Sequence, residues 1–292
     1  MTTQAADVLG ATVTAPPPRA RRSRGGRNRA GRNWGVGIYS VVVLAILLVP
    51  IVYTITFSFN VPGRTNVTWR GFSVANWTGI VDDPRVVAAF GTSIVVGVLA
   101  TLVASALGTA IAIALVRFRF RFRTALTLLL FLPMATPEVV LGSGLGSQLL
   151  NLGIDKNIGT VVIAHVMFCI SFVVVTVRAR VASLDPAIEE AGRDLYASPA
   201  QVWWRITFPL LLPGIVAAAL LSFALSFDDF IITAFVSGNA ETFPKYIYTA
   251  AARAIPAQAN VFASLIFFIA IGLVLAQQLS AAARRRRLAR NG

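Results

Sequence analysis

The chain has 292 residues, of which 56% are hydrophobic and only 13% charged, and its formal net charge is +14 at pH 7. A single cysteine excludes an internal disulfide. There is also only one histidine, and no spacing in the sequence is typical of a metal site. Apolar runs longer than the roughly 20 residues that cross a bilayer indicate an all-α, polytopic membrane protein.

Six membrane spans are predicted from these apolar runs. In chain order they cover residues 34–59, 88–116, 124–146, 158–177, 210–236 and 261–279. Together they define a transmembrane domain over residues 34–282. An Arg-rich segment, residues 1–33, precedes this domain and is expected to be disordered, and a basic tail, residues 283–292, follows it.

The basic residues predict the orientation of the chain. Most of the 26 Lys and Arg lie in the N-terminal segment, in the loops 117–123 and 178–207, and in the C-terminal tail. Because Lys and Arg favour the cytoplasmic side, both termini and these two loops are expected in the cytoplasm. The clusters flank spans, so they indicate topology and contact with membrane lipid, and they do not favour a nucleic-acid partner.

The third predicted span is interrupted by Pro133 and Pro137, and Glu138 follows directly. Proline bends a transmembrane helix and frees backbone carbonyls. A carboxylate beside such a break is costly in lipid, so Glu138 is expected to face protein or water. Three small residues then allow another helix to come close, namely Gly142, Gly144 and Gly146.

The fourth predicted span carries His165 and, one helical turn later, Cys169. His165 is expected to be paired within the bundle and Cys169 to serve packing. These two residues do not supply the nucleophile, base or metal ligands of a membrane-embedded enzyme.

A polar island lies between the fourth and fifth spans. A helix that begins at Asp185, with Pro186 in its first turn, has suitable N-terminal chemistry. Pro199 follows a break and can open a second short helix that runs towards Pro209. These short helices, over about residues 185–208, are expected to form a docking surface at the cytoplasmic end of the bundle.

This loop resembles the EAA signature of bacterial ABC-importer permeases, whose usual form is E-A-A-x(3)-G-x(9)-I-x-L-P. The matching residues are Glu190, Ala191, Ile206 and Pro209. The chain departs from the signature at three positions, with Gly192 for the second Ala, Tyr196 for the Gly and Phe208 for the Leu.

The resemblance implies a type I ABC-importer permease fold in the bacterial plasma membrane. In that family the loop forms a coupling helix that sits in a groove of an ATPase subunit. The ATPase-coupling residues of this chain would then be Glu189, Glu190, Ala191, Gly192, Asp194 and Tyr196. Tyr196 stands where Gly would form a tight turn, which leaves open how this turn is made.

Two adjacent acids, Asp228 and Asp229, lie in the fifth predicted span. Neighbours on a helix point about 100° apart, so the two carboxylates cannot face the same way. One is expected to line a pathway and the other to bind a polar group on an adjacent helix.

The residues around these acids narrow the resemblance to the second permease subunit of spermidine/putrescine importers. The runs that carry it are Ser226 to Phe230, Phe235 to Gly238, and Phe243 with Pro244. The resemblance implies that the chain forms half of a translocation pathway for polyamines. Because a polyamine is a multiply charged cation, its pathway would be lined by Asp228, Asp229 and Glu138.

The same resemblance implies the partners of the chain. They are a homologous permease subunit, a dimer of ABC ATPase subunits and an extracytoplasmic substrate-binding protein. The sequence has no Gly-rich turn followed by Lys that could cradle phosphates, so ATP and Mg²⁺ are expected on the partner ATPase and no cofactor on this chain. The chain is accordingly expected not to be an enzyme.

Two other transport functions remain open from the residues alone. An ABC-importer permease for another solute, such as thiamine, iron or another small cation, would share the coupling loop. A secondary transporter would need no ATPase, but it would more often show internal repeats, which the sequence lacks.

Overall fold

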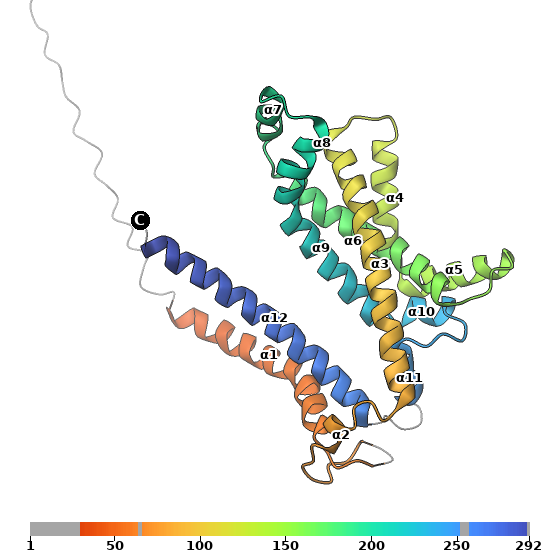
Figure 1. The fold of residues 1–292 in the computed structure, drawn as a ribbon. Coiled ribbons are helices and arrows are strands. Elements are labelled where there is room, and N and C mark those ends of the chain that lie inside the picture. The colour runs from red at the N-terminus through yellow and green to blue at the C-terminus, as the bar shows by residue number, and fades with distance from the viewer. Residues whose placement is uncertain (1–29, 64–65, 252–256, 291–292) are drawn as a thin grey trace, which may run out of the picture. The chain divides into compact units, whose positions relative to one another are not determined.

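The computed structural model describes residues 30–63, 66–251 and 257–290, and these residues form a helical protein (Figure 1). Within this part of the chain, one isolated β-bridge between Asn60 and Phe72 is the only β-structure. Residues up to Val52 form one unit and those from Tyr53 onwards a second. The predicted N-terminal segment lies outside the described residues as far as residue 29, and residues 30–33 begin the first helix.

The helices take the following order along the chain. They are α1 (Ala30–Ser58), α2 (Ala75–Thr78), α3 (Pro84–Arg117), α4 (Arg123–Ala135), α5 (Glu138–Asn151), α6 (Ile158–Ala182), α7 (Ala187–Asp194), α8 (Pro199–Val202), the π-helical turn η1 (Trp203–Thr207), α9 (Phe208–Asp228), α10 (Ile231–Val236), α11 (Phe243–Ala251) and α12 (Ala257–Arg290). The predicted basic tail is thus helical as far as residue 290, and residues 291–292 lie outside the described part.

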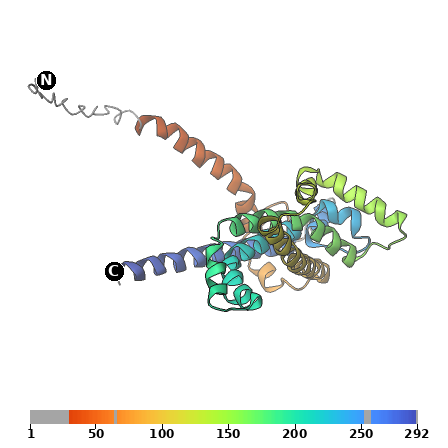
Figure 2. The same cartoon turned by 90° about the horizontal axis from the view of Figure 1, so that it is seen from above.

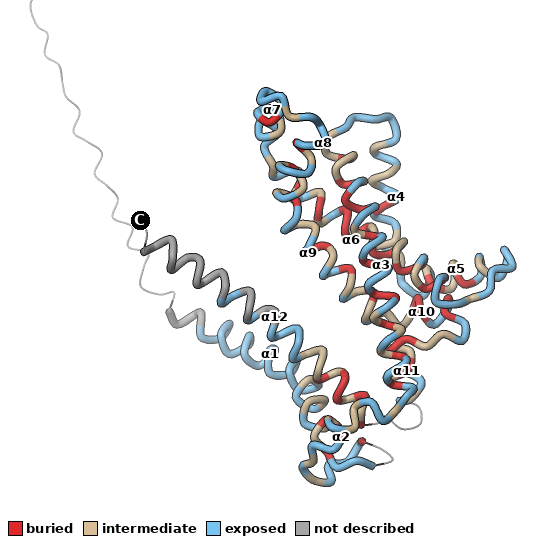
Figure 3. Tube along the Cα trace, in the orientation of Figure 1, coloured by how far each residue is buried: buried red, intermediate tan, exposed pale blue. Residues whose placement is uncertain are grey.

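Three long helices, α3, α6 and α9, pack against one another and form the core of the second unit. Figure 3 shows that their buried residues lie on the faces that they turn towards one another. Small residues permit this packing: a Cβ added to Gly108 of α3 would lie 2.6 Å from Cγ1 of Val173 on α6. The outer faces of these helices expose Val, Leu and Ile, as expected for surfaces that meet lipid.

The third predicted span, 124–146, is broken at Pro137, as its prolines indicate. It consists of α4 and α5, whose axes differ by 106°. Thr136 precedes Pro137 and is extended, with φ −86° and ψ 134°. The cause is Pro137, because its ring disfavours the helical conformation of the preceding residue. Figure 2 shows the consequence, which is that α5 runs beside α10.

The fifth predicted span, 210–236, is also not one continuous helix. Its first part, α9, ends at Asp228, and Asp229 is extended with ψ 121° before α10 begins. At its other end the helix starts earlier than predicted, since Pro199–Asp228 is continuous through α8 and η1. Pro209 explains the π-helical turn, because its ring cannot fit against the carbonyl four residues earlier, and the N–H of Phe208 bonds to the carbonyl of Trp203 instead.

The structure therefore does not reproduce the six predicted spans one for one. By length and composition, four described helices can cross a membrane, and the bent pair α4 and α5 makes a fifth. The sixth predicted span, 261–279, lies within α12, which contains the apolar stretch Ala257–Gly272. The prediction of an all-α polytopic membrane protein is confirmed.

Candidate functional site

The polar island between α6 and α9 forms the two short helices that the sequence predicts. Oδ1 of Asp185 accepts the N–H of Ala187 at 2.9 Å at the start of α7. Ser198 opens α8 with a capping box, in which its hydroxyl and the side chain of Gln201 bond reciprocally to backbone N–H groups. Two glutamates in the first turn of α7 and an arginine in its last turn complement the helix dipole.

The turn after α7 forms although tyrosine stands in the place of glycine. Tyr196 has a φ of 58°, in the left-handed region. Its N–H bonds to the carbonyl of Arg193 at 2.9 Å, and the N–H of Ala197 bonds to the carbonyl of Gly192 at 3.2 Å. These two bonds define a Schellman motif, the usual C-terminal cap in which Gly is preferred. The tight turn is therefore preserved, at the cost of a strained tyrosine.

The six predicted coupling residues do not share one environment. Four of them are exposed, namely Glu190, Ala191, Asp194 and Tyr196. Gly192 is buried, and a Cβ at this position would lie 2.7 Å from Cδ1 of Ile206. Glu189 is turned inwards and binds Arg117 at the end of α3. The exposed four form a surface that a partner protein can reach, and the role of all six in coupling stays a prediction.

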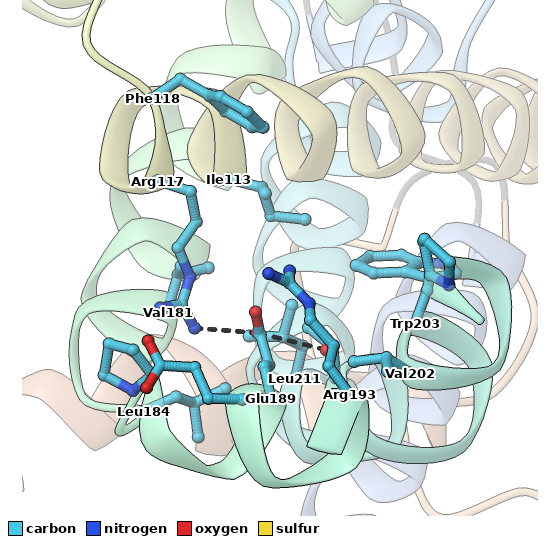
Figure 4. A pocket seen from close by; sticks show the side chains of 14 residues that line it. Ile113, Arg117, Phe118, Val181, Leu184, Glu189, Arg193, Val202, Trp203 and Leu211 are labelled. Atoms are coloured by element: carbon cyan, nitrogen blue, oxygen red, sulfur yellow. Dashed lines mark hydrogen bonds and ion pairs between the residues drawn. The ribbon is translucent and has the colours of Figure 1, made fainter. Parts of the chain in front are cut away.

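A pocket of about 420 Å³ lies behind α7, between the ends of α3, α6 and α9. In Figure 4 the side chain of Arg117 points from the end of α3 into this pocket, where its ion pair is marked. Sequence reasoning missed this role, because the alternating Arg and Phe from residue 117 to 123 indicated only a lipid anchor.

A second cavity, of about 480 Å³, brings the three predicted pathway acids together. Glu138, Asp228 and Asp229 all line it, along with Phe168 and Phe230. It lies where two helices are interrupted, since Glu138 begins α5 and Asp228 ends α9. The helix breaks thus place Glu138 at the same cavity as the two adjacent aspartates, although Glu138 is far from them in the sequence.

The two adjacent aspartates have different surroundings, as predicted, but the cause is the end of α9 at Asp228 and not the 100° step of a continuous helix. Asp228 is exposed, whereas the side chain of Asp229 is only 5% exposed. The carboxylate of Asp229 accepts the N–H of Thr233 at 2.8 Å and its hydroxyl at 2.9 Å. Oδ2 of Asp229 also lies 3.1 Å from Nε2 of His165. Asp229 therefore holds the start of α10 and a polar group of α6.

The contacts of His165 determine its tautomer. An ionised carboxylate can only accept, so Nε2 carries the proton that is donated to Asp229. In the neutral ring Nδ1 then accepts, and its partner at 2.7 Å is the hydroxyl of Ser226. The prediction that His165 is paired within the bundle is thus confirmed. Its partners lie on both sides of the helix break, with Ser226 in α9, Asp229 at the break and Thr233 in α10.

Only two of the three glycines of α5 lie at its contact with α10. A Cβ on Gly142 would lie 2.8 Å from the ring of Phe235, and one on Gly146 would lie 2.9 Å from the backbone oxygen of Phe235. Nothing lies within 4 Å of such an atom on Gly144. The close approach predicted for all three is therefore wrong for Gly144, which faces away from α10.

Comparison with known proteins assigns the chain to a family. The family described as the binding-protein-dependent transport system inner membrane component matches residues 104–288, which include α7 and the acidic cavity. The chain belongs to this family and is a multi-pass inner-membrane component of a transport system. The family resemblance predicted from the sequence is confirmed.

Curated relatives and solved structures agree with this assignment. The chain is 33% identical over 239 residues to the spermidine/putrescine transport system permease protein PotC of Haemophilus influenzae, covering 82% of this chain and 93% of that protein. It is 33% identical to the putrescine transport system permease protein PotI of Escherichia coli K12, covering 83% of this chain and 89% of that protein.

Among solved structures, the crystal structure of a bacterial alginate ABC transporter, in complex with an alginate pentasaccharide-bound periplasmic protein, matches with a TM-score of 0.62. The identity is 16%, and the match covers 87% of this chain and 96% of that one. A bacterial ABC transporter that imports the acidic polysaccharide alginate matches with a TM-score of 0.59 at 17% identity, covering 86% of this chain and 97% of that one. The predicted fold of an ABC-importer permease is thereby confirmed.

Proposed function

We propose that the chain is the permease subunit of an ATP-driven importer and forms half of the translocation pathway for polyamines such as spermidine and putrescine. The observation that carries the proposal is the cavity at the two helix breaks, where three carboxylates and two aromatic rings meet. The names of the relatives, PotC and PotI, support the same class of substrate.

The lining of this cavity suits a flexible chain with several positive charges. Glu138 and Asp228 are exposed, so both can meet an ammonium group without first losing a protein partner. Phe168 and Phe230 supply apolar surface for methylene groups and ring faces for cations. Phe230 is held in place by Tyr248, whose ring stacks on it with centroids 4.2 Å apart. A pathway of this kind attracts a cation without binding it too tightly to leave.

The fold alone does not determine which substrate is transported. The solved structures with this fold include an importer of alginate, which is an acidic polysaccharide. A cavity with three carboxylates repels an anion, so the substrate class follows from these side chains and from the curated relatives.

The partners follow from the same proposal. A homologous permease subunit would complete the pathway, and an extracytoplasmic binding protein would deliver the substrate. A dimer of ATPase subunits would bind ATP and Mg²⁺ and would dock on the exposed residues of α7, while this chain would bind no cofactor. Both termini would then lie in the cytoplasm, as the distribution of Lys and Arg predicts.

Uptake of labelled spermidine tests the substrate class. Cells that lack the chain should lose uptake, and expression of the chain should restore it. Unlabelled putrescine should compete with this uptake and thiamine should not. Competition by thiamine, iron or another small cation would identify an importer for that solute, and uptake that never depends on the chain would refute the polyamine assignment.

A further inference from the structure

The carboxylate of Glu189 joins three elements of the second unit. Its Oε1 lies 2.9 Å from Nη2 of Arg117, the last residue of α3. The same oxygen accepts the hydroxyl of Thr207, the last residue of η1, at 3.2 Å. The side chains of Arg117 and Glu189 are each 19% exposed, so water reaches the pair only in part.

Few other contacts hold α7 to the long helices. Within residues 66–251, the bonds to Arg117 and Thr207 are the only side-chain hydrogen bonds or ion pairs that join α7 to another helix. Gly192 adds a close apolar contact with Ile206. The remaining connection is the backbone at both ends of α7. One carboxylate therefore makes all the polar side-chain contacts that link α7 to α3 and to the start of α9.

The neighbouring glutamate has the opposite environment. Glu190 is exposed and makes no hydrogen bond or ion pair with the described residues. The two side chains point about 100° apart on the helix, so one acid faces the bundle when the other faces outwards. Both residues are among the six predicted coupling residues, but their different environments indicate different roles.

We propose that Glu189 is a positioning residue that makes α3 and α9 move with α7, while Glu190 faces the ATPase. This inference rests on the function proposed above, in which an ATPase subunit docks on α7. A charge-assisted hydrogen bond that is largely shielded from water is stronger and more directional than an exposed one. Without this bond α7 can shift on its flanking turns while α3 stays in place, so movement of the ATPase is lost before it reaches the pathway.

A distance measurement on the chain alone tests the positioning role without any partner. Spin labels would be placed at Ala179→Cys on α6 and Asp194→Cys on α7, both exposed positions, with the chain in lipid nanodiscs. Cys169 is fully buried and does not take up label. We expect one narrow distance distribution in the parent chain, a clearly broader one in Glu189→Gln, and a narrow one in the matched control Glu190→Gln.

Charge reversal separates the ion pair from a general loss of structure. Arg117→Glu alone should broaden the distribution, and the double variant with Glu189→Arg should narrow it again. A Glu189→Gln distribution as narrow as that of the parent would overturn the proposal. So would equal broadening in Glu190→Gln, or a double variant that stays broad.

Substrate uptake per ATP hydrolysed in the assembled transporter tests the consequence. In Glu189→Gln the ATPase subunits should still co-purify, because Glu189 faces the bundle, but uptake per ATP should fall about tenfold. Unchanged uptake per ATP, or loss of the ATPase subunits, would contradict the proposed role. If the parent complex binds no ATPase or imports no polyamine, the proposed function fails, and the label distances still decide whether Glu189 positions α7.

Discussion

Nε2 of His165 lies 3.1 Å from Oδ2 of Asp229, and this contact joins the first half of α6 to the break between α9 and α10. The histidine is 1% exposed, and its other ring nitrogen is also paired. A buried polar network in which every member has a partner specifies one arrangement of its helices. The position of α10, and with it one wall of the acidic cavity, depends on this contact.

Replacing His165 should therefore destabilise the fold. His165→Phe leaves the carboxylate of Asp229 and the hydroxyl of Ser226 with one partner fewer, which should cost about 1–3 kcal/mol of unfolding free energy. His165→Gln keeps a donor and an acceptor and should cost less. Thermal unfolding of the detergent-purified chain measures both, and equal melting temperatures for His165→Phe and the parent would show that the network contributes nothing.

The cavity acids should contribute to uptake without being needed for assembly. Asp228→Asn and Glu138→Gln each remove one negative charge from the lining, and uptake of spermidine at low concentration should fall about tenfold, as expected for a loss of roughly 1.4 kcal/mol. Asp155→Asn, at an exposed site outside the cavity, is the control. Asp229→Asn should lower both uptake and stability, because Asp229 also pairs with His165. Unchanged uptake in all three cavity variants would remove these residues from the pathway.

The exposed glutamate of α7 should govern contact with the ATPase. Glu190→Arg reverses the charge of the predicted docking surface and should reduce co-purification of the ATPase subunit several-fold. The same change at the distant Asp155 should have no effect. Normal co-purification of the Glu190→Arg chain would refute docking at this surface.

Replacing Tyr196, whose backbone lies in the left-handed region, should raise the stability of the chain. Tyr196→Gly should stabilise the chain by about 0.5–1 kcal/mol, because the backbone strain it relieves exceeds the greater flexibility that Gly has in the unfolded chain. The neighbouring Leu195 is also exposed but has a φ of −85°, so Leu195→Gly should instead destabilise. Chemical unfolding of the two variants measures the difference, and a loss of stability in Tyr196→Gly would contradict the assigned turn.

Two glycines of α5 provide a matched pair. Gly146→Ala places a Cβ against the backbone oxygen of Phe235 and should cost about 1–3 kcal/mol through overpacking. Gly144→Ala meets open space and should instead gain about 0.5–1 kcal/mol from the better helix propensity of Ala. The stability of both variants in detergent tests the packing of α5 on α10, and equal effects would show that the two helices do not approach as described.

Local chemistry predicted much of this fold. The apolar runs located the long helices, and Asp185 and Pro199 marked the starts of the short ones. The proline at position 137 indicated a break but not its angle of 106°, because the direction of α5 is set by its packing on α10. The break at Asp229 carries no Pro or Gly, so the apolar pattern ran through it unnoticed.

Pairing between residues far apart in the chain could not be predicted from the sequence. Adjacent acids in a span predicted that one would bind a polar group, but nothing in a single sequence identified His165, which lies 64 residues before Asp229. The ion pair of Arg117 with Glu189 spans 72 residues. Both contacts depend on how the helices pack, and a local pattern cannot encode that.

The separation between His165 and Asp229 has a consequence for biogenesis. At a synthesis rate of about 5–20 residues per second, roughly 3–13 seconds pass between the translation of these two residues. During that interval the segment that becomes α6 leaves the ribosome with a histidine whose carboxylate partner has not yet been made. Its mean hydropathy of 2.5 is high enough to carry this one polar ring into the membrane alone. We therefore expect α6 to insert first and Asp229 to fix its position afterwards.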